Sequence, residues 1–460
     1  MPEIAFDQFG GGLDRRSSQS IAAANILWTL KNAYITTGKK IRKRPCLTKI
    51  ATLEAGTAGL KGAGGKLNTF YGQGTITHAN PLFLANKVAH PTLAVDVAKA
   101  HFAEMFNGFL YASVEYTNGD VKHHYLDGTS PTHIADTNCP NSKQVKKLSQ
   151  KIYAAAGADV RFCATSLPRN WTLALDAGTI AAGINASGSD TVTALGDFKG
   201  DLGVFFSDGT QLWDVDSDPS LNALKSTADS VGTIYAKSTQ ALAGDLIFLA
   251  KQGFRSLSLL ALTNNLQEND VGSAIEAFRS EISDAADPQS VYYPGLGQLW
   301  CINGTRAYVY SFARGVKLSA WSIFDFAVTV DAAAVLSNEL YLRSGNNVYK
   351  VDPAVFDDDG TIPLVEVEMY YQDNQAPGIE KQFFGFDGVV KGSPDIAFRY
   401  DPRDTSLITP FVPITADMRP GDLFPMELCA TSVAPVFRHQ ANEEFQIDQL
   451  LLYYEKLGPV

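Results

Sequence analysis

Four histidines, His101, His123, His124 and His133, form the first group of side chains in this sequence that could do chemistry. Imidazole is a common ligand of zinc and other transition metals, so a cluster of histidines raises the question of a metal site. Their spacing matches no zinc motif. Adjacent residues of a strand also point to opposite faces, so His123 and His124 cannot bind one ion. We predict structural histidines and no metal.

Two runs of aspartates resemble parts of a calcium-binding loop: Asp214, Asp216 and Asp218, and then Asp357, Asp358 and Asp359 before Gly360. An EF-hand loop also needs a glycine in its middle and a glutamate at its end, and neither stands at the required place. We therefore predict that both runs are solvated turns.

The common catalytic signatures are missing from the sequence: there is no G-x-S-x-G, H-E-x-x-H, Walker A loop or C-x-x-C pair. The run Gly10–Gly12 lacks the strand and helix context that a nucleotide site needs. The cysteines, at positions 46, 139, 163, 301 and 429, are odd in number and widely spaced. This pattern indicates free thiols. We predict that the chain is not an enzyme and binds no cofactor.

The densest charge in the chain is basic and lies between Lys39 and Arg44. Five like charges in six residues usually mark a solvated surface, which is the interpretation we favour; the alternative is contact with an acidic neighbour or with phosphate. The preceding arm, FGGGLDRR, is rich in glycine, which loses the most freedom on folding, so we expect the arm to lie against a partner. The candidate assembly contacts are Phe9, Arg15, Arg16, Lys39, Lys40, Arg42, Lys43 and Arg44.

The elements that position these residues are predicted to be short strands, most clearly between Ser290 and Phe326. An apolar run ends at Asn303-Gly304, a dipeptide typical of tight hairpins, and the next run alternates in polarity. The strands are 291–293, 298–302, 306–312 and 317–324, the last with Trp321 pointing outward. A meander of this length is typical of one β-propeller blade.

The same order of strand, tight turn and strand recurs along the chain. The further hairpins span residues 109–125, 151–164, 202–215, 245–260 and 339–351. Six such units predict a six-bladed β-propeller over residues 49–363. In its first part we predict a flexible loop at 55–65 and strands at 67–71 and 82–85.

Two helices are also predicted. Residues 142–150, SKQVKKLSQ, have the pattern of an amphipathic helix. Residues 273–286 begin with a capping box, Ser273 with Glu276, and end before Pro288. On this second helix, Ile275, Phe278 and Ile282 share one face.

Residues 364–460 are predicted to form a separate antiparallel β-sandwich, because LVEVEMYY alternates in polarity and many prolines keep the later strands short. The pairs Phe383-Phe384 and Tyr453-Tyr454 each direct one ring to the core and one outward. Residues 1–48 remain as an N-terminal arm with the first strands, which we expect to make an assembly contact. The fold class is therefore all-β, a six-bladed propeller with an added sandwich-like domain.

The 460 residues carry a net charge of −11, and 19% of them are charged. A sequence-specific DNA-binding module is normally basic, so this balance argues against one. The sequence shows no signal peptide and no apolar run of membrane-spanning length. We expect synthesis in the cytoplasm.

Several segments together resemble the tail nozzle, or packaged-DNA stabilisation, proteins of short-tailed bacteriophages. The most specific are FGGGLDRR and LKNAYITTGKKIRKRP, within residues 9–45. The segments GQLWCINGTRAYVYSF, SAWSIFDF and QIDQLLLYYEKLG, with the predicted helix at 273–286, fit the same family. The sequence departs from the family by lacking a proline-rich stretch between Arg16 and Ile21.

The resemblance implies a structural virion protein of the phage tail. Six copies would form a ring below the portal and adaptor rings, in contact with tail fibre or needle proteins. The ring would retain the genomic double-stranded DNA and conduct it without sequence specificity. Two other classes stay open: a propeller glycosidase, which needs a carboxylate pair at the channel, and a carbohydrate-binding or receptor-binding virion protein.

Overall fold

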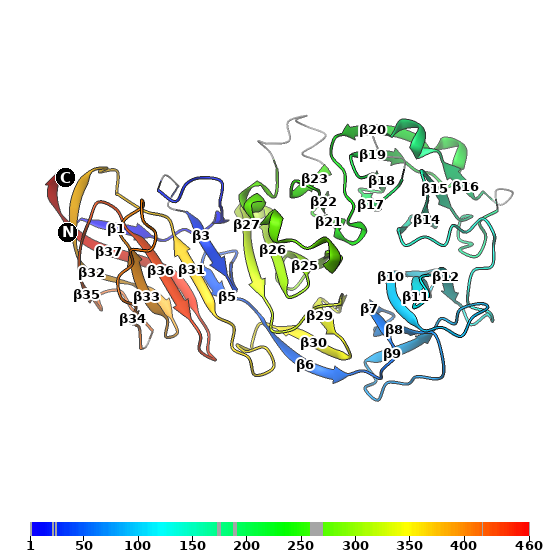
Figure 1. The fold of residues 1–460 in the computed structure, drawn as a ribbon, viewed down its shortest axis with the longest axis horizontal. Coiled ribbons are helices and arrows are strands. Elements are labelled where there is room, and N and C mark those ends of the chain that lie inside the picture. Colours follow the sequence, from blue (N-terminus) through cyan, green and yellow to red (C-terminus); the bar gives the residue numbers. More distant parts are fainter. Residues whose placement is uncertain are drawn as a thin grey trace.

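A computed structural model gives the structure of residues 2–20, 23, 25–172, 176–186, 191–257, 270–415 and 417–459. The regular structure in these residues is almost entirely β-strand. Figure 1 shows two parts, a ring of sheets from the middle of the chain and a two-sheet part at the left that holds both termini. The prediction of an all-β protein is confirmed.

The ring is a β-propeller whose sheets are mostly antiparallel. In chain order the sheets are β7 (Ala58–Ala63), β8 (Lys66–Tyr71), β9 (Phe83–Lys87); β10 (Val97–Phe106), β11 (Phe109–Tyr116), β12 (Val121–Leu126); β13 (Val145–Leu148), β14 (Lys151–Ala156), β15 (Asp159–Phe162), β16 (Gly178–Ile180); β17 (Ala194–Phe198), β18 (Asp201–Phe205), β19 (Gly209–Asp214), β20 (Ala223–Asp229); β21 (Gln240–Leu242), β22 (Asp245–Leu249), β23 (Phe254–Ser256); β24 (Gln289–Tyr293), β25 (Gln298–Asn303), β26 (Arg306–Ala313), β27 (Leu318–Asp325); and β28 (Ala332–Leu336), β29 (Glu339–Ser344), β30 (Asn347–Asp352) with β6 (Cys46–Thr52). The first strands of successive sheets contact one another in a closed circle, β7–β10–β13–β17–β21–β24–β28 and back to β7. This closed circle establishes the propeller.

The propeller has seven blades in the described part of the chain, whereas six were predicted from the hairpins. The additional blade begins with β7, inside the segment that we expected to be a flexible loop. A Cβ atom on Gly62 would lie 2.0 Å from the carbonyl oxygen of Val335, and one on Gly59 would lie 2.6 Å from Cβ of Ala100. Glycine is therefore present because neighbouring inner strands pack closely, and not because this segment is flexible.

Strand β6 closes the ring. It precedes every other propeller strand in the sequence, yet it pairs antiparallel with β30 of the last blade. The last blade is thus built from two distant segments, which ties the beginning of the propeller to its end. The boundary expected between residues 48 and 49 falls inside this strand.

The blade formed by β24 to β27 has the hairpin predicted at Asn303-Gly304. Trp321, expected to point outward, is instead buried, with its ring centroid 4.8 Å from that of Phe254. The reason is that both faces of this blade are covered: the two faces of β26 belong to different hydrophobic clusters.

The helix predicted at residues 142–150 does not form. Residues 145–148 are β13, which buries Val145 and Leu148. An inner blade strand is covered on both faces, so its apolar residues need not alternate, and tertiary packing overrides the helical pattern.

The segment 273–286 forms 3₁₀-helices, η5 (Ser273–Glu281) and η6 (Asp284–Ala286), in place of one α-helix. The predicted capping box is wrong: the cap position is Gly272, and Glu276 binds Arg255. The predicted apolar face is correct, because Ile275 and Ile282 are buried. The other short 3₁₀-helices are η2 (Ala182–Asn185), η3 (Pro219–Leu221), η4 (Ala236–Ser238) and η7 (Arg314–Val316).

The second part of the molecule is a sandwich of two sheets that combine both ends of the chain, the blue and the orange-to-red strands of Figure 1. One sheet contains β35 (Phe424–Ala430), β32 (Ile379–Lys391), β37 (Gln446–Pro459), β5 (Ile41–Lys43), β4 (Ala33–Ile35) and β1 (Glu3–Phe6). The other contains β2 (Gly12–Leu13), β3 (Ile26–Lys31), β31 (Val365–Met369), β36 (Ala434–His439), β33 (Asp395–Arg399) and β34 (Val412–Pro413).

The sandwich and the propeller share a sheet. Strands β2 and β3 both pair in parallel with β27, so the blade β24–β27 continues through them into the sandwich. One hydrophobic cluster, which includes Leu13, Trp321 and Phe437, extends across this junction. The two parts are therefore joined by backbone hydrogen bonds as well as by apolar packing.

Candidate functional site

The candidate site is the junction where the terminal strands join the propeller to the sandwich. At its centre Arg44 is almost completely buried and forms an ion pair with Asp358. All five N–H groups of Arg44 have acceptors: Nε donates to Asn32 Oδ1 at 3.0 Å, Nη1 to Asp358 Oδ1 and Pro45 O, and Nη2 to Asp358 Oδ2 and Asp325 O. A guanidinium that is fully used inside its own chain is not available to a partner.

Two expectations about these residues are thereby corrected. Arg44 was expected on a solvated turn or at an assembly contact, and Asp358 was expected in a solvated turn. Burial of one charge is costly, but each neutralises the other, and the remaining hydrogen bonds are satisfied. Asp358 also accepts a hydrogen bond from the amide of Leu47 at 3.0 Å, which holds the start of β6 in place.

Asn32 connects the ion pair to two further segments. Its Oδ1 accepts hydrogen bonds from Arg44 and from the amide of Asp325, and its Nδ2 donates to Leu364 O at 2.8 Å. Its φ of +54° lies in the left-handed region, which asparagine tolerates better than most residues. Asn32 thus fixes the end of the last strand of one blade beside the start of the C-terminal segment.

The glycine-rich arm, which we expected to lie against a partner, packs into its own chain instead. Phe9 is fully buried in the shared core, and its amide donates to Lys39 O. A Cβ atom on Gly11 would lie 2.3 Å from Cγ2 of Ile26, and one on Gly12 would lie 2.7 Å from Cβ of Ala320. The glycines allow the arm to insert between β27 and β3.

Arg15 and Arg16 follow the arm and behave differently from each other. The Arg15 guanidinium stacks over Trp28, 3.8 Å from the ring centroid, and its loss of hydration lowers its pKa. Arg16 forms a bidentate pair with Asp14. This pair raises the pKa of Arg16, whose side chain remains mostly exposed. Of the two, Arg16 is the one that a partner could reach.

Three remaining members of the basic cluster meet acidic or carbonyl groups in β37 or in the loop before it. Lys40 pairs with Asp448, and Arg42 pairs with Glu444 at 3.3 Å. Lys43 is buried and donates to Ala441 O at 2.8 Å; burial lowers its pKa. Lys39 is half-buried, and its stem covers Gly10. The cluster does contact an acidic neighbour, but that neighbour belongs to the same chain.

A second charged group, on the inner strands of the propeller, was missed by sequence reasoning. Lys61 on β7 pairs with Glu104 on β10 at 3.0 Å. Loss of hydration lowers the pKa of Lys146 on β13. The carboxylates of Asp197 on β17 and of Glu104 oppose this shift but do not cancel it. Four successive inner strands thus carry charges of alternating sign. These residues are widely separated in the sequence and meet only when the ring closes, so no local pattern could reveal them.

The histidines are structural, as predicted. His123 and His124 are buried on opposite faces of β12; His123 Nδ1 bonds the Tyr111 hydroxyl and His124 Nε2 bonds the Tyr116 hydroxyl, each at 2.7 Å. Burial lowers the pKa of His123 to about 4 and that of His124 to about 3. His101 bonds Glu115 at 2.7 Å.

Among the described residues, no group of three or more His, Cys, Asp or Glu side chains is arranged to hold a metal ion. Asp218 accepts a hydrogen bond from the Ser220 amide at the start of η3, so the first aspartate run forms a turn. None of the helices described is long and apolar enough to cross a membrane.

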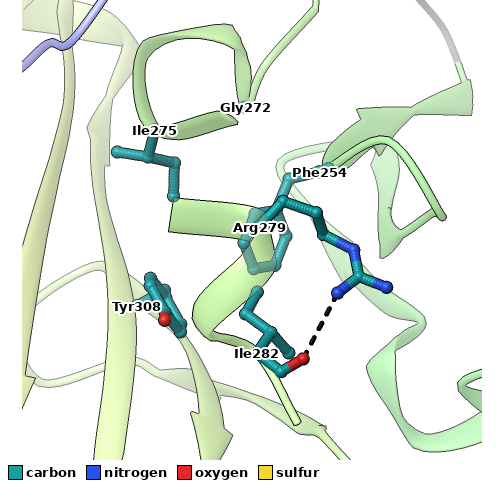
Figure 2. Close-up of a pocket in the computed structure, with 7 residues that line it drawn as sticks. Phe254, Gly272, Ile275, Arg279, Ile282 and Tyr308 are labelled. Carbon is teal, nitrogen blue, oxygen red and sulfur yellow. Dashed lines mark hydrogen bonds between the residues drawn. The ribbon is translucent and has the colours of Figure 1, made fainter. Parts of the chain in front are cut away.

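A small cavity lies where η5 meets the propeller (Figure 2). Its lining includes Phe254, Ile275, Ile282 and Tyr308, and Arg279, which also lines it, donates to Ile282 O at 3.3 Å. It has room for about one water molecule, which is too little for a substrate.

The sequence matches no protein-family model and no curated protein. Similar solved structures include a chain of the mitotic checkpoint complex, with 10% identity over 76% of this chain and 91% of that chain and a TM-score of 0.36. BamB from Moraxella catarrhalis has 10% identity over 66% and 96% of the two chains, with a TM-score of 0.37. The Pan2 WD40 domain of Neurospora crassa has 10% identity over 55% and 88%, with a TM-score of 0.30.

Proposed function

We propose that this chain is a structural virion protein of a short-tailed bacteriophage. Six copies form the tail nozzle, a ring that closes the portal channel, retains the packaged DNA and conducts it during ejection. The observation that carries the proposal is the place of the segment that most resembles the nozzle family: residues 9–45 supply the arm, Asn32 and Arg44, which build the junction between propeller and sandwich.

This junction suits a protein that must keep its shape against the pressure of packaged DNA. The shared sheet joins the two parts through backbone hydrogen bonds, and Arg44 with Asp358 joins the two ends of the chain. A buried polar network in which every donor is satisfied makes a junction rigid. Each copy is then a stiff building unit for a ring.

The proposed partners are the portal and adaptor rings above the nozzle and the tail fibre or needle proteins below it. The genomic double-stranded DNA passes through the ring without sequence-specific contacts. The chain's net charge of −11 supports this role, because tight phosphate binding would stall a moving genome. In this proposal the protein is made in the host cytoplasm, resides in the virion tail, and has no substrate, cofactor or catalytic residue.

The competing proposal of a propeller glycosidase has less support. Such an enzyme needs one carboxylic acid whose pKa is raised, so that it can protonate the leaving group. Burial raises the pKa of Asp287, but the neighbouring Lys237 outweighs this effect, so the pKa of Asp287 is lowered. Burial likewise raises the pKa of Glu115, but hydrogen bonds from Lys143 and His101 outweigh this effect, so the pKa of Glu115 is lowered.

The test of the proposal is the mass of the purified full-length chain, alone and with a short-tailed phage portal and adaptor, measured by native mass spectrometry. A hexamer that joins the adaptor ring supports the nozzle. The hexamer should bind duplex DNA weakly, with a steep loss of affinity as salt rises. A chain that stays monomeric at all concentrations, or that binds DNA tightly at high salt, contradicts the proposal.

A further inference from the structure

The sandwich sheet that contains β32 and β37 has an outer face with a mainly apolar centre, in which the buried carboxylate of Asp387 accepts a hydrogen bond from the Tyr453 hydroxyl at 3.2 Å. The adjacent aromatic pairs divide as predicted: Phe383 and Tyr454 are buried in the core, while Phe384 and Tyr453 lie half-buried on the outer face. There the two outer rings stack, with centroids 6.5 Å apart. Leu451 is also half-buried, and because its neighbours in the strand, Leu450 and Leu452, are core residues, it lies on the outer face.

The rim of this outer face is acidic. Glu3 is the register partner of Tyr453, so their side chains share one face of the sheet. Glu427 and Glu455 are exposed on β35 and β37. None of these three carboxylates has a cation within ion-pair distance in the described part of the chain, so their charge is unopposed.

The propeller offers a surface of the opposite charge. Lys66 on β8 and Lys87 on β9 are exposed, and in the described residues their ammonium groups donate only to the main-chain oxygens of Pro81 and Gly74. Leu84, 48% exposed, lies between them in the sequence, on β9. Strand β9 is the outer strand of its sheet, so its far edge has no strand beside it among the described residues.

We propose that the outer face of the sandwich, centred on Phe384 and Tyr453, docks on the β8–β9 edge of the propeller in a second copy of this chain. This inference rests on the proposed ring and identifies its subunit contact. Charge complementarity favours the basic β8–β9 edge of a second copy as the surface that meets the sandwich face. Two acidic sandwich faces would repel each other and could not pair face to face. A contact between two different surfaces of one chain is heterologous, and repeating it generates a closed ring when the rotation closes.

The apolar centre and the charged rim have different roles in such a contact. Buried aromatic side chains at the centre of an interface provide most of its affinity. Charges at the rim select the partner and speed association, and their contribution falls as salt rises. The contact should therefore weaken at high salt and fail when Phe384 is replaced.

The test uses two variants of the full chain with reversed charge. The first carries Glu427→Lys and Glu455→Lys on the sandwich face, and the second carries Lys66→Glu and Lys87→Glu on the propeller edge. Each variant alone should remain monomeric at concentrations where the wild type assembles, with a dissociation constant raised at least about tenfold. An equimolar mixture should assemble again, because every interface in an alternating ring then joins opposite charges.

Asp229→Lys is the matched control, since Asp229 is exposed on β20, away from both surfaces. It should assemble like the wild type. If each variant assembles normally, or if both fail and their mixture does not recover, the inferred contact is wrong while the ring itself still stands. If the wild-type chain never assembles, both the ring proposal and this inference are wrong.

Discussion

Arg44 and Asp358 are 314 positions apart in the sequence, yet they form an ion pair in which neither side chain is more than 3% exposed. Arg44 directly follows β5, the last of the N-terminal strands in the sandwich. Asp358 lies between β30 of the last blade and β31, the first of the C-terminal strands. The pair therefore adds a buried ionic link between the N-terminal strands and the segment after the last blade, beside the strand pairing and apolar packing that already join the propeller to the sandwich.

Replacing one member of this pair should be strongly destabilising. Arg44→Met leaves the Asp358 carboxylate buried without a counter-charge, so we expect the free energy of unfolding to fall by about 3–5 kcal/mol. Urea unfolding followed by circular dichroism measures this loss. Arg42→Met is the control, because Arg42 and Glu444 are both about one third exposed and their pair contributes at most about 1 kcal/mol. Equal losses in the two variants would contradict the structural role of Arg44.

Adding a single methyl group to the arm should destabilise the fold. Gly12→Ala places a Cβ atom 2.7 Å from Cβ of Ala320, at a φ of +62° that alanine rarely adopts. We expect a loss of about 1–3 kcal/mol. Gly315→Ala is the matched control, because no atom lies within 4 Å of its added Cβ. If Gly12→Ala has the thermal midpoint of Gly315→Ala, the arm is not packed as described.

Stability should decrease as the pH falls below about 6.5. In the folded chain, burial holds the pKa of His123 at about 4 and that of His124 at about 3, below their ordinary value of 6.5. At pH values between the lowered pKa of each histidine and 6.5, the unfolded chain binds protons that the folded chain does not. The stabilisation is thus complete above the unfolded pKa and is lost towards pH 4, by about 1.4 kcal/mol per pH unit for each histidine.

Unfolding free energies measured between pH 7.5 and pH 4.5 test this dependence. His124→Asn should show a shallower slope, because one proton fewer separates the two states. The absolute stability of this variant will also be lower, since it disturbs the hydrogen bond to Tyr116. The slope is the decisive quantity, and an unchanged slope would show that His124 is not buried in its neutral form.

Thiol reactivity should distinguish one cysteine from the other four. Cys46, Cys139, Cys163 and Cys301 are buried, and burial raises the pKa of each thiol to about 12, so little thiolate forms at pH 8. Cys429 is exposed. Maleimide treatment of the native chain should add one label, and treatment in guanidinium should add five, as counted by intact mass. A native chain that accepts several labels would contradict the buried positions.

Local pattern was sufficient where a structural feature depends on neighbouring residues. The hairpin at Asn303-Gly304 and the division of Phe383-Phe384 and Tyr453-Tyr454 between core and surface follow from turn chemistry and strand alternation. So does the structural role of His123 and His124, which must face opposite sides of β12. These features together predicted an all-β propeller with an added sandwich.

The features that sequence reasoning missed depend on residues far apart in the chain. The glycines of β7 suggested a loop, but they allow close packing against β10 of the next blade and against β28, which only ring closure brings near. The alternating charges of Lys61, Glu104, Lys146 and Asp197 likewise exist only in the closed ring.

The sequence by itself determined the tight hairpins and the strands beside them, such as the hairpin at Asn303-Gly304, because strand alternation and tight turns are properties of adjacent residues. The tertiary structure alone decided that the propeller has a seventh blade, that β6 closes it and that both chain ends share one sandwich. It also decided that Arg44 is buried rather than solvated. The burial of a charge depends on its counter-charge, and Asp358 lies beside Arg44 only because the propeller strands between them in the sequence form a closed ring.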